Sequence, residues 1–107
     1  MAQSESFVPP ASVAKVAAKA LEGRREHRRG GTMVGVRRAV QLSNRQPVSL
    51  STIRRMVSYF ARHEVDKQSP AFYRGTKFPS AGRIAWDLWG GEPGKRWANA
   101  TWNRYGK

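Results

Sequence analysis

Apolar residues recur along the chain at the spacing of amphipathic helices. The clearest pattern follows the candidate N-caps Ser49 and Ser51. Its apolar positions fall at i, i+3, i+4, i+7 and i+8, namely Ile53, Met56, Val57, Phe60 and Ala61. This spacing places all five side chains on one side of a helix, so the segment predicts a helix with one buried face.

Two earlier helices follow from the same spacing. The first begins at Pro9-Pro10 and runs to about Glu22 or on into the arginine cluster, with the apolar stripe Val13, Val16, Ala17, Ala20 and Leu21. Thr32, directly after Gly30-Gly31, is the expected N-cap of the second helix, which the sequence SNRQP ends. The side chains expected to turn inward from this second helix are Met33, Val36, Ala39 and Val40.

The C-terminal third predicts two more helices. The first is capped by Ser80, stopped by Gly90-Gly91, and buries Ile84, Ala85, Leu88 and Trp89, with Trp86 off that face. The last begins near Pro93 and brings Ala98, Trp102 and Tyr105 to one side, with Trp97 beside them. Residues 65–78 read as a long loop whose aromatic side chains fold back onto the core: Phe72, Tyr73 and Phe78.

These elements predict a mainly α protein, a compact bundle of four to five short helices with a helix-turn-helix arrangement as one option. A chain of 107 residues supports one domain, expected over residues 9–107, after a flexible arm of residues 1–8. Only 39% of the residues are hydrophobic, so the aromatic side chains must supply much of the core. Burial is therefore expected for Trp89, Trp97 and Trp102, whereas Trp86 stays open as a contact residue.

The charge of the chain indicates the kind of partner that it binds. Twenty Lys and Arg against seven Asp and Glu give a net charge of +13, and a charge of this size calls for a polyanion or counterions. Between Arg24 and Arg62 the chain holds ten arginines and a single acid, Glu26. The predicted nucleic-acid contacts are Arg24, Arg25, Arg28, Arg29, Arg37, Arg38, Arg45, Arg54, Arg55, Arg62 and Trp86.

Two modes of nucleic-acid binding fit these arginines. The segment SLSTIRRMVSYF has the features of a recognition helix, with a serine cap and two arginines near its N-terminal end that can pair with guanine. The preceding LSNRQPVSLS is longer than the turn of three to four residues usual in a helix-turn-helix. Phosphate contact without base readout requires only clustered arginines, and both modes remain open.

Other chemistry finds little support in the sequence. Without cysteine there is no disulfide framework, thiolate zinc site or cysteine nucleophile. The sequence HEVDK places His63, Glu64 and Asp66 together, but nothing completes a metal or catalytic site, so we expect no enzyme and no cofactor. No apolar run approaches the roughly 20 residues of a membrane span, so no membrane partner is expected.

The segments TIRRMVSYFARHEVDK and PSAGRIAWDLWGGEPGKRWAN resemble a small domain encoded by tailed bacteriophages and prophages, alone or beside head-region proteins such as the prohead protease. The resemblance spans roughly residues 7–99 and implies a role near virion assembly or genome handling, in the host cytoplasm or the virion. It supplies no catalytic residues. We therefore expect a phage protein that binds nucleic acid, with double-stranded DNA as the favoured target. The alternatives are a virion or head-assembly protein that docks on an acidic protein surface, and an inhibitor of a host protein.

Overall fold

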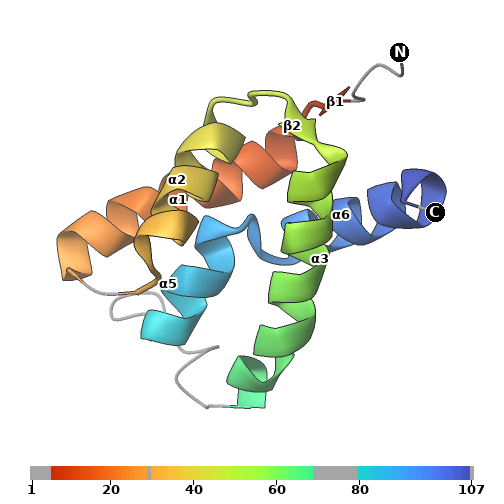
Figure 1. Cartoon of the computed structure of the whole chain (residues 1–107). Helices are drawn as coiled ribbons and strands as arrows, with labels where there is room; N and C mark the ends of the chain where they lie inside the picture. Colours follow the sequence, from red (N-terminus) through yellow and green to blue (C-terminus); the bar gives the residue numbers. More distant parts are fainter. Residues whose placement is uncertain (1–5, 29, 69–79, 107) are drawn as a thin grey trace.

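A computed structural model describes residues 6–28, 30–68 and 80–106, and it confirms a mainly helical bundle (Figure 1). The described helices are α1 (Ala11–His27), α2 (Met33–Ser43), α3 (Leu50–His63), α5 (Ala81–Leu88) and α6 (Gly91–Tyr105). A 3-10 helix, η1 (Glu64–Gln68), continues α3. Two short strands, β1 (Ser6–Phe7) and β2 (Val48–Ser49), pair antiparallel.

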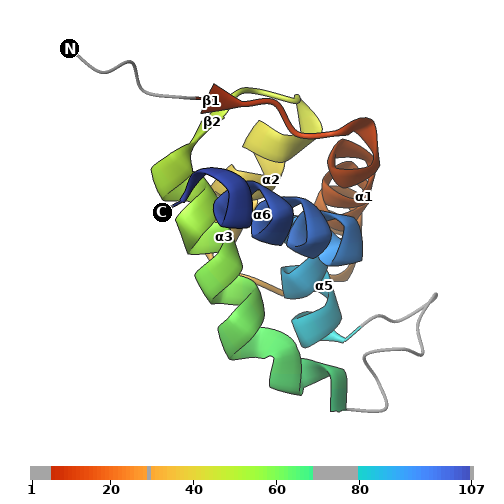
Figure 2. The ribbon, with the colours of Figure 1, turned by 90° about the vertical axis from the view of Figure 1, so that its right-hand side faces the viewer.

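The helices form two pairs with α5 between them. α2 runs back along α1, and α6 crosses α3 on the other side of the molecule (Figures 1 and 2). α5 packs mainly on α1, with further contacts to α2, η1 and α6. The arrangement leaves α2 and α3 facing one another, each held by a different partner.

Side-chain caps fix where three of the helices begin. The Thr32 hydroxyl accepts from the Gly35 amide at 3.3 Å, and the Ser80 hydroxyl accepts from the Arg83 amide at 3.0 Å. Both predicted caps are confirmed. Of the two candidates before α3, Ser49 is the cap, since its hydroxyl accepts from the Thr52 amide at 3.2 Å.

The core is built around aromatic and aliphatic side chains from α3 and α5. Phe60 meets the edge of Trp86 with ring centroids 4.8 Å apart, and both side chains are almost fully buried. Ile53, Met56 and Leu88 are also fully buried, as the spacing predicts. Ala61, expected inside, is exposed, and Tyr59 takes its place in the core.

The predicted buried face of α2 is wrong by part of a turn. Ala39 is buried as predicted, but Met33 and Val40 are 63% and 44% exposed, and Gly35 and Leu42 are buried instead. Small residues on this side let α2 approach its neighbours closely; a Cβ on Gly35 would lie 3.3 Å from Trp89 Nε1. Close packing on α1 and α5 therefore outweighs the burial of the larger Met33 and Val40.

Trp86 is likewise not a contact residue, because its side chain is only 1% exposed. α5 is eight residues long and is covered on more than one side, so its apolar positions do not form a single stripe. Ile84 and Leu88 lie against the turn that joins α1 to α2, while Trp86 packs against α3. The Lys67 ammonium lies over the Trp86 ring at 4.6 Å.

Only Trp89 and Gly90 separate α5 from α6. Gly90 and Gly91 adopt φ values of 107° and 63°, and α6 begins at Gly91, with Pro93 in its first turn rather than at its start. A Cβ on Gly90 would lie 2.8 Å from Val13 Cγ1 and 2.9 Å from Gly94 Cα, so only glycine fits there. Ala98 is buried as predicted, whereas Tyr105 is 39% exposed.

The start of the chain and the long loop were predicted less completely. Ser6 and Phe7, inside the expected arm of residues 1–8, pair with Ser49 and Val48, and the Phe7 ring lies 5.1 Å from that of Tyr105. The expected loop begins instead with η1. Its aromatic side chains Phe72, Tyr73 and Phe78 lie outside the described residues. The proposed division into arm and domain stays a prediction.

Candidate nucleic-acid interface

A groove of about 980 Å³ separates α2 from α3 and is floored in part by α5. The main packing partners of α2 are α1 and α5, while that of α3 is α6. In a helix-turn-helix the two helices pack on each other and the second protrudes. The connection from Asn44 to Ser49 instead carries the chain across the groove, so the helix-turn-helix option does not describe this packing.

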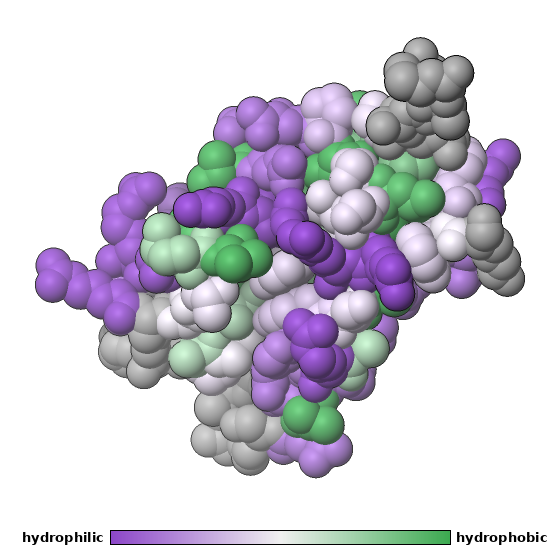
Figure 3. All heavy atoms as spheres, viewed as in Figure 1, coloured by the Kyte–Doolittle hydropathy of each residue, from purple (hydrophilic) through white to green (hydrophobic). Residues whose placement is uncertain are grey.

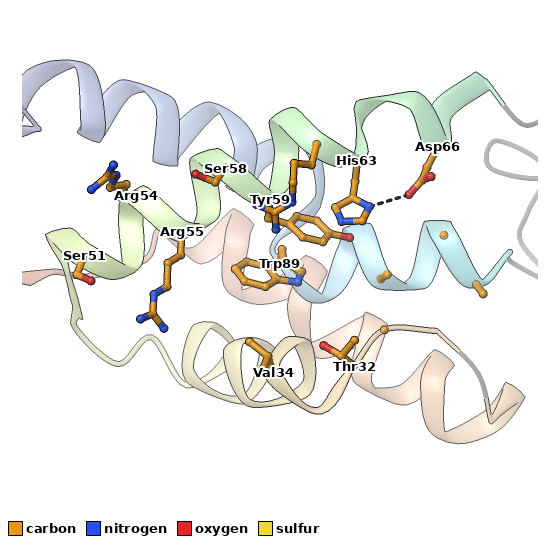
Figure 4. A pocket seen from close by; sticks show the side chains of 15 residues that line it. Thr32, Val34, Ser51, Arg54, Arg55, Ser58, Tyr59, His63, Asp66 and Trp89 are labelled. Carbon is orange, nitrogen blue, oxygen red and sulfur yellow. Dashed lines mark ion pairs between the residues drawn. The ribbon is translucent and has the colours of Figure 1, made fainter.

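The polar side of α3 forms one wall of this groove (Figure 4). The exposed residues of α3 are Ser51, Arg54, Arg55, Ser58, Ala61 and Arg62. All of them except Ala61 line the groove. Guanidinium and hydroxyl groups therefore follow one another along about three turns of a single wall.

Arg54 and Arg55 are neighbours in sequence but point in different directions. Arg55 reaches from α3 toward α2, whereas Arg54 points away from α2 (Figure 4). The Arg54 guanidinium lies over the Trp102 ring of α6 at 5.9 Å. The two side chains thus form a natural pair for comparison, one inside the groove and one at its edge.

Arg38 of α2 faces the same region and is half-buried. Its guanidinium lies over the Trp89 ring at 5.5 Å, and its Nη1 donates to Gln41 Oε1 at 2.6 Å. The buried Nε finds no hydrogen-bond partner among the described residues. Desolvation and the nearby charge of Arg55 lower the pKa of the Arg38 guanidinium, so the two arginines repel one another.

Stacked aromatic rings form the floor of the groove. The Tyr59 and Trp89 rings are nearly parallel, with 7° between their planes and 4.5 Å between their centroids. The His63 ring also stacks on the Tyr59 ring, with the two centroids 4.4 Å apart. The Tyr59 hydroxyl is buried and lacks a hydrogen-bond partner among the described residues. Burial, then the charges of Asp66 and Asp87, raise the pKa of this hydroxyl despite Arg62, which lowers it. It therefore stays a neutral donor.

An ion pair and small residues lie at one end of the groove. His63 Nδ1 lies 3.3 Å from Asp66 Oδ2, drawn as the dashed line in Figure 4. Asp66 packs beside Gly82, where a Cβ would lie 3.6 Å from the carboxylate carbon. The opposite wall begins at the N-terminus of α2, where Thr32 and the exposed Val34 line the groove.

Not all predicted arginines join this groove. Arg25 and Arg28 are exposed at the end of α1, and Arg24 Nε donates to the Gly30 carbonyl at 2.9 Å, which ties the turn between α1 and α2. Arg45, with φ of 51°, donates from Nε to the Pro9 carbonyl at 2.8 Å. Arg29 lies outside the described residues. Arg37 is exposed and, with Arg38, follows Val34 on one side of α2 at i+3 and i+4.

We call the arginines of α2 and α3 the arginine face: Arg37, Arg38, Arg54, Arg55 and Arg62. Among the described residues none of them forms an ion pair with a carboxylate. Seen from the side of Figure 1, strongly hydrophilic side chains gather between α2 and α3, with hydrophobic ones among them (Figure 3). This face is thus positively charged and is not neutralised by the carboxylates that the structure describes.

Most described carboxylates lie elsewhere and have cationic partners. Lys67 Nζ bridges Glu64 at 3.0 Å and Glu92 at 2.6 Å, and Lys95 Nζ adds a second contact to Glu64 at 2.9 Å. The hydrogen bonds from Lys95 and Lys67 lower the pKa of Glu64. Desolvation raises the pKa of Asp87 against the opposing effect of Arg83, which it meets at 3.0 Å. We call Glu64, Lys67, Glu92 and Lys95 the ion-pair cluster.

Sequence reasoning missed the floor of the groove. Tyr59 and His63 fall one position off the apolar stripe of α3, and their i, i+4 spacing was the available signal that they lie together. Trp89 was assigned to the core, which its 8% exposure supports, yet its edge also lines the groove. Val34 lines the groove because of the way α2 is turned on its neighbours, which the sequence does not show.

The chain matches no family model and shows no significant similarity to a curated protein or to a solved structure. The phage resemblance therefore stays a prediction. Within the described ranges, no three histidine or acidic side chains are grouped as metal ligands would be. None of the described helices has the length and apolar character needed to cross a membrane.

Proposed function

We propose that this protein binds nucleic acid by contacting phosphates with the arginine face. The observation that carries the proposal is the separation of charge. Five arginines on two facing helices have no carboxylate partner among the described residues, whereas Glu64, Asp87 and Glu92 are paired elsewhere. Arginine is suited to this task because its planar guanidinium can hold a phosphate through two hydrogen bonds and always stays charged.

Salt titration tests the proposal. If each arginine displaces counterions from a phosphate, the logarithm of affinity falls linearly with the logarithm of salt concentration, by about 0.9 per contact. The triple variant Arg37→Gln, Arg55→Gln, Arg62→Gln should flatten this slope by roughly 2.7. Fluorescence anisotropy with labelled oligonucleotides at four salt concentrations measures both slope and affinity.

A matched control removes the same charge from another surface. Lys15, Lys19 and Arg96 are solvent-accessible on α1 and α6, and none of them lines the groove. Their triple change to Gln should leave the slope within about one unit, since net charge alone would then be the only difference. Parent affinity weaker than about 10⁻⁴ M for every oligonucleotide at physiological salt would reject the proposal.

A second candidate function is docking on an acidic protein surface, such as one in a virion or head assembly. The observation that favours it is apolar: Met33, Val34 and Val40 are 63%, 52% and 44% exposed on α2, beside the arginines. Phosphates gain nothing from such side chains, whereas protein interfaces bury them. Replacing Met33 and Val40 with Ser should leave nucleic-acid affinity unchanged and weaken only a protein partner.

A further inference from the structure

The shape of the arginine face selects among nucleic acids. Protein helices read a duplex by entering its major groove, about 12 Å wide, which requires a helix that protrudes. The polar side of α3 instead lines a groove, with α2 standing opposite. A double helix can touch the rim of this groove but cannot enter it, whereas a single strand can.

The α3 wall offers contacts of the kind that a strand backbone needs. Arg55, Ser58 and Arg62 succeed one another at intervals of three and four residues, about one helical turn each. Guanidinium and hydroxyl groups both donate to phosphate oxygens. Among the residues that line the groove, the carboxylate is that of Asp66, which is already paired with His63.

The floor offers what a base needs. Tyr59 lines the groove, and its hydroxyl is buried and donates to no acceptor among the described residues. A buried donor without an acceptor costs free energy that a ligand acceptor can recover. Base edges carry carbonyl and ring-nitrogen acceptors, and their faces fit beside Val34 and the edge of Trp89. In a duplex these edges are paired and turned inward.

We propose that the groove between α2 and α3 binds a short single-stranded segment of nucleic acid, with phosphates along Arg55, Ser58 and Arg62 and a base edge accepting from the Tyr59 hydroxyl. The inference rests on the proposed function, because it assumes that the arginine face binds nucleic acid. It differs from the sequence-based expectation of double-stranded DNA.

The experiment compares a fluorescein-labelled oligodeoxythymidine of about twelve nucleotides with a duplex of the same length. We expect the single strand to bind the parent protein at least about tenfold more tightly at the same salt concentration. Tyr59→Phe removes only the hydroxyl, so it should weaken single-strand binding by about three- to tenfold, the effect of one hydrogen bond. Its melting temperature should stay the same or rise, which separates a binding role from a structural one.

Arg55→Gln and Arg54→Gln form the matched pair. The Arg55 change should weaken single-strand binding severalfold more than the Arg54 change, because Arg55 points across the groove toward α2 and Arg54 points away from α2. Equal losses for the two variants would overturn the groove assignment. Duplex binding equal to or tighter than single-strand binding would overturn this inference and leave the proposed function standing. Binding to neither, with binding to a labelled polyglutamate, would overturn both and favour the protein partner.

Discussion

Cationic side chains have opposite roles in the arginine face and in the ion-pair cluster. In the ion-pair cluster, Lys67 and Lys95 each lie within 3.0 Å of a carboxylate, so their positive charges are neutralised by neighbouring side chains. On the arginine face, Arg38 and Arg55 repel one another with no described acid between them. The net charge of +13 is therefore not spread evenly, since part of it lies, without described acidic partners, where two helices face each other across a groove.

The difference teaches which region serves folding and which serves binding. Natural surfaces that keep like charges together sacrifice stability, and such sacrifices are common where a ligand must bind. Changes in the ion-pair cluster should therefore alter stability with little effect on binding. Changes on the arginine face should do the reverse.

The largest expected effect tests whether Trp86 belongs to the core that supports both regions. Trp86 lies under Lys67 of the ion-pair cluster and against Phe60, so Trp86→Ala should cost about 3 to 5 kcal/mol of unfolding free energy. That is most of the stability of a domain this small. Urea unfolding followed by circular dichroism measures it. A variant that unfolds like the parent but no longer binds nucleic acid would restore Trp86 as a contact residue.

The second prediction exchanges charge in the two regions. Arg62→Glu should weaken nucleic-acid binding at least about tenfold, because it removes one phosphate contact and adds repulsion. Its stability should change by less than about 0.5 kcal/mol, since Arg62 has no carboxylate partner among the described residues. Anisotropy and urea unfolding on the same preparation give both numbers.

Lys95→Glu is the counterpart in the ion-pair cluster. It places a carboxylate beside Glu64, where Lys95 Nζ now lies 2.9 Å away, so stability should fall by about 1 kcal/mol. Binding should change less than about threefold. If the two variants affect binding equally, net charge governs binding and the arginine face has no special role.

Much of this contrast was visible in the sequence, but not its geometry. The caps Thr32 and Ser80 and the stripe of Ile53, Met56 and Phe60 were predictable because local hydrogen bonds and helical spacing determine them. The clustering of arginines was also plain. These are properties of neighbouring residues.

The groove itself was not predictable, because it depends on which helices pack together. Periodicity placed Met33, Ala39 and Val40 inside, but only Ala39 of these is buried. Close approach through Gly35 rotates α2 by part of a turn and leaves Met33 and Val40 exposed. The same packing brought Arg38 over Trp89, a residue 51 positions later in the chain. Trp86 was misplaced for a related reason: a short helix covered on several sides has no single apolar stripe.

The third prediction asks what the charge repulsion costs. Arg38→Met keeps an unbranched side chain over Trp89 but removes a half-buried charge whose Nε lacks a partner among the described residues. Stability should rise by about 0.5 to 1 kcal/mol, which corresponds to a few degrees in melting temperature. Nucleic-acid affinity should fall severalfold in the same variant. A melting temperature below that of the parent would mean that the bond to Gln41 outweighs the repulsion.

The smallest expected effect is the pH dependence of the stability that the ion-pair cluster contributes. The hydrogen bonds from Lys95 and Lys67 lower the pKa of Glu64, so its ionised form stabilises the folded state at neutral pH. This contribution is complete above the ordinary carboxyl pKa and disappears as pH falls through the lowered value in the folded protein. Because Glu64 is well exposed to solvent, the gain should be no more than about 1 kcal/mol.

Glu64→Gln isolates that contribution. Parent and variant should differ in urea midpoint at about pH 7 and coincide near pH 2, while Asp87, whose raised pKa acts in the opposite direction, affects both proteins alike and cancels. Nucleic-acid binding should remain unchanged at pH 7, since Glu64 lies in the ion-pair cluster. A midpoint difference that persists at pH 2 would show that the loss comes from packing of the side chain rather than from its charge, and the ion-pair cluster would then not stabilise the fold electrostatically.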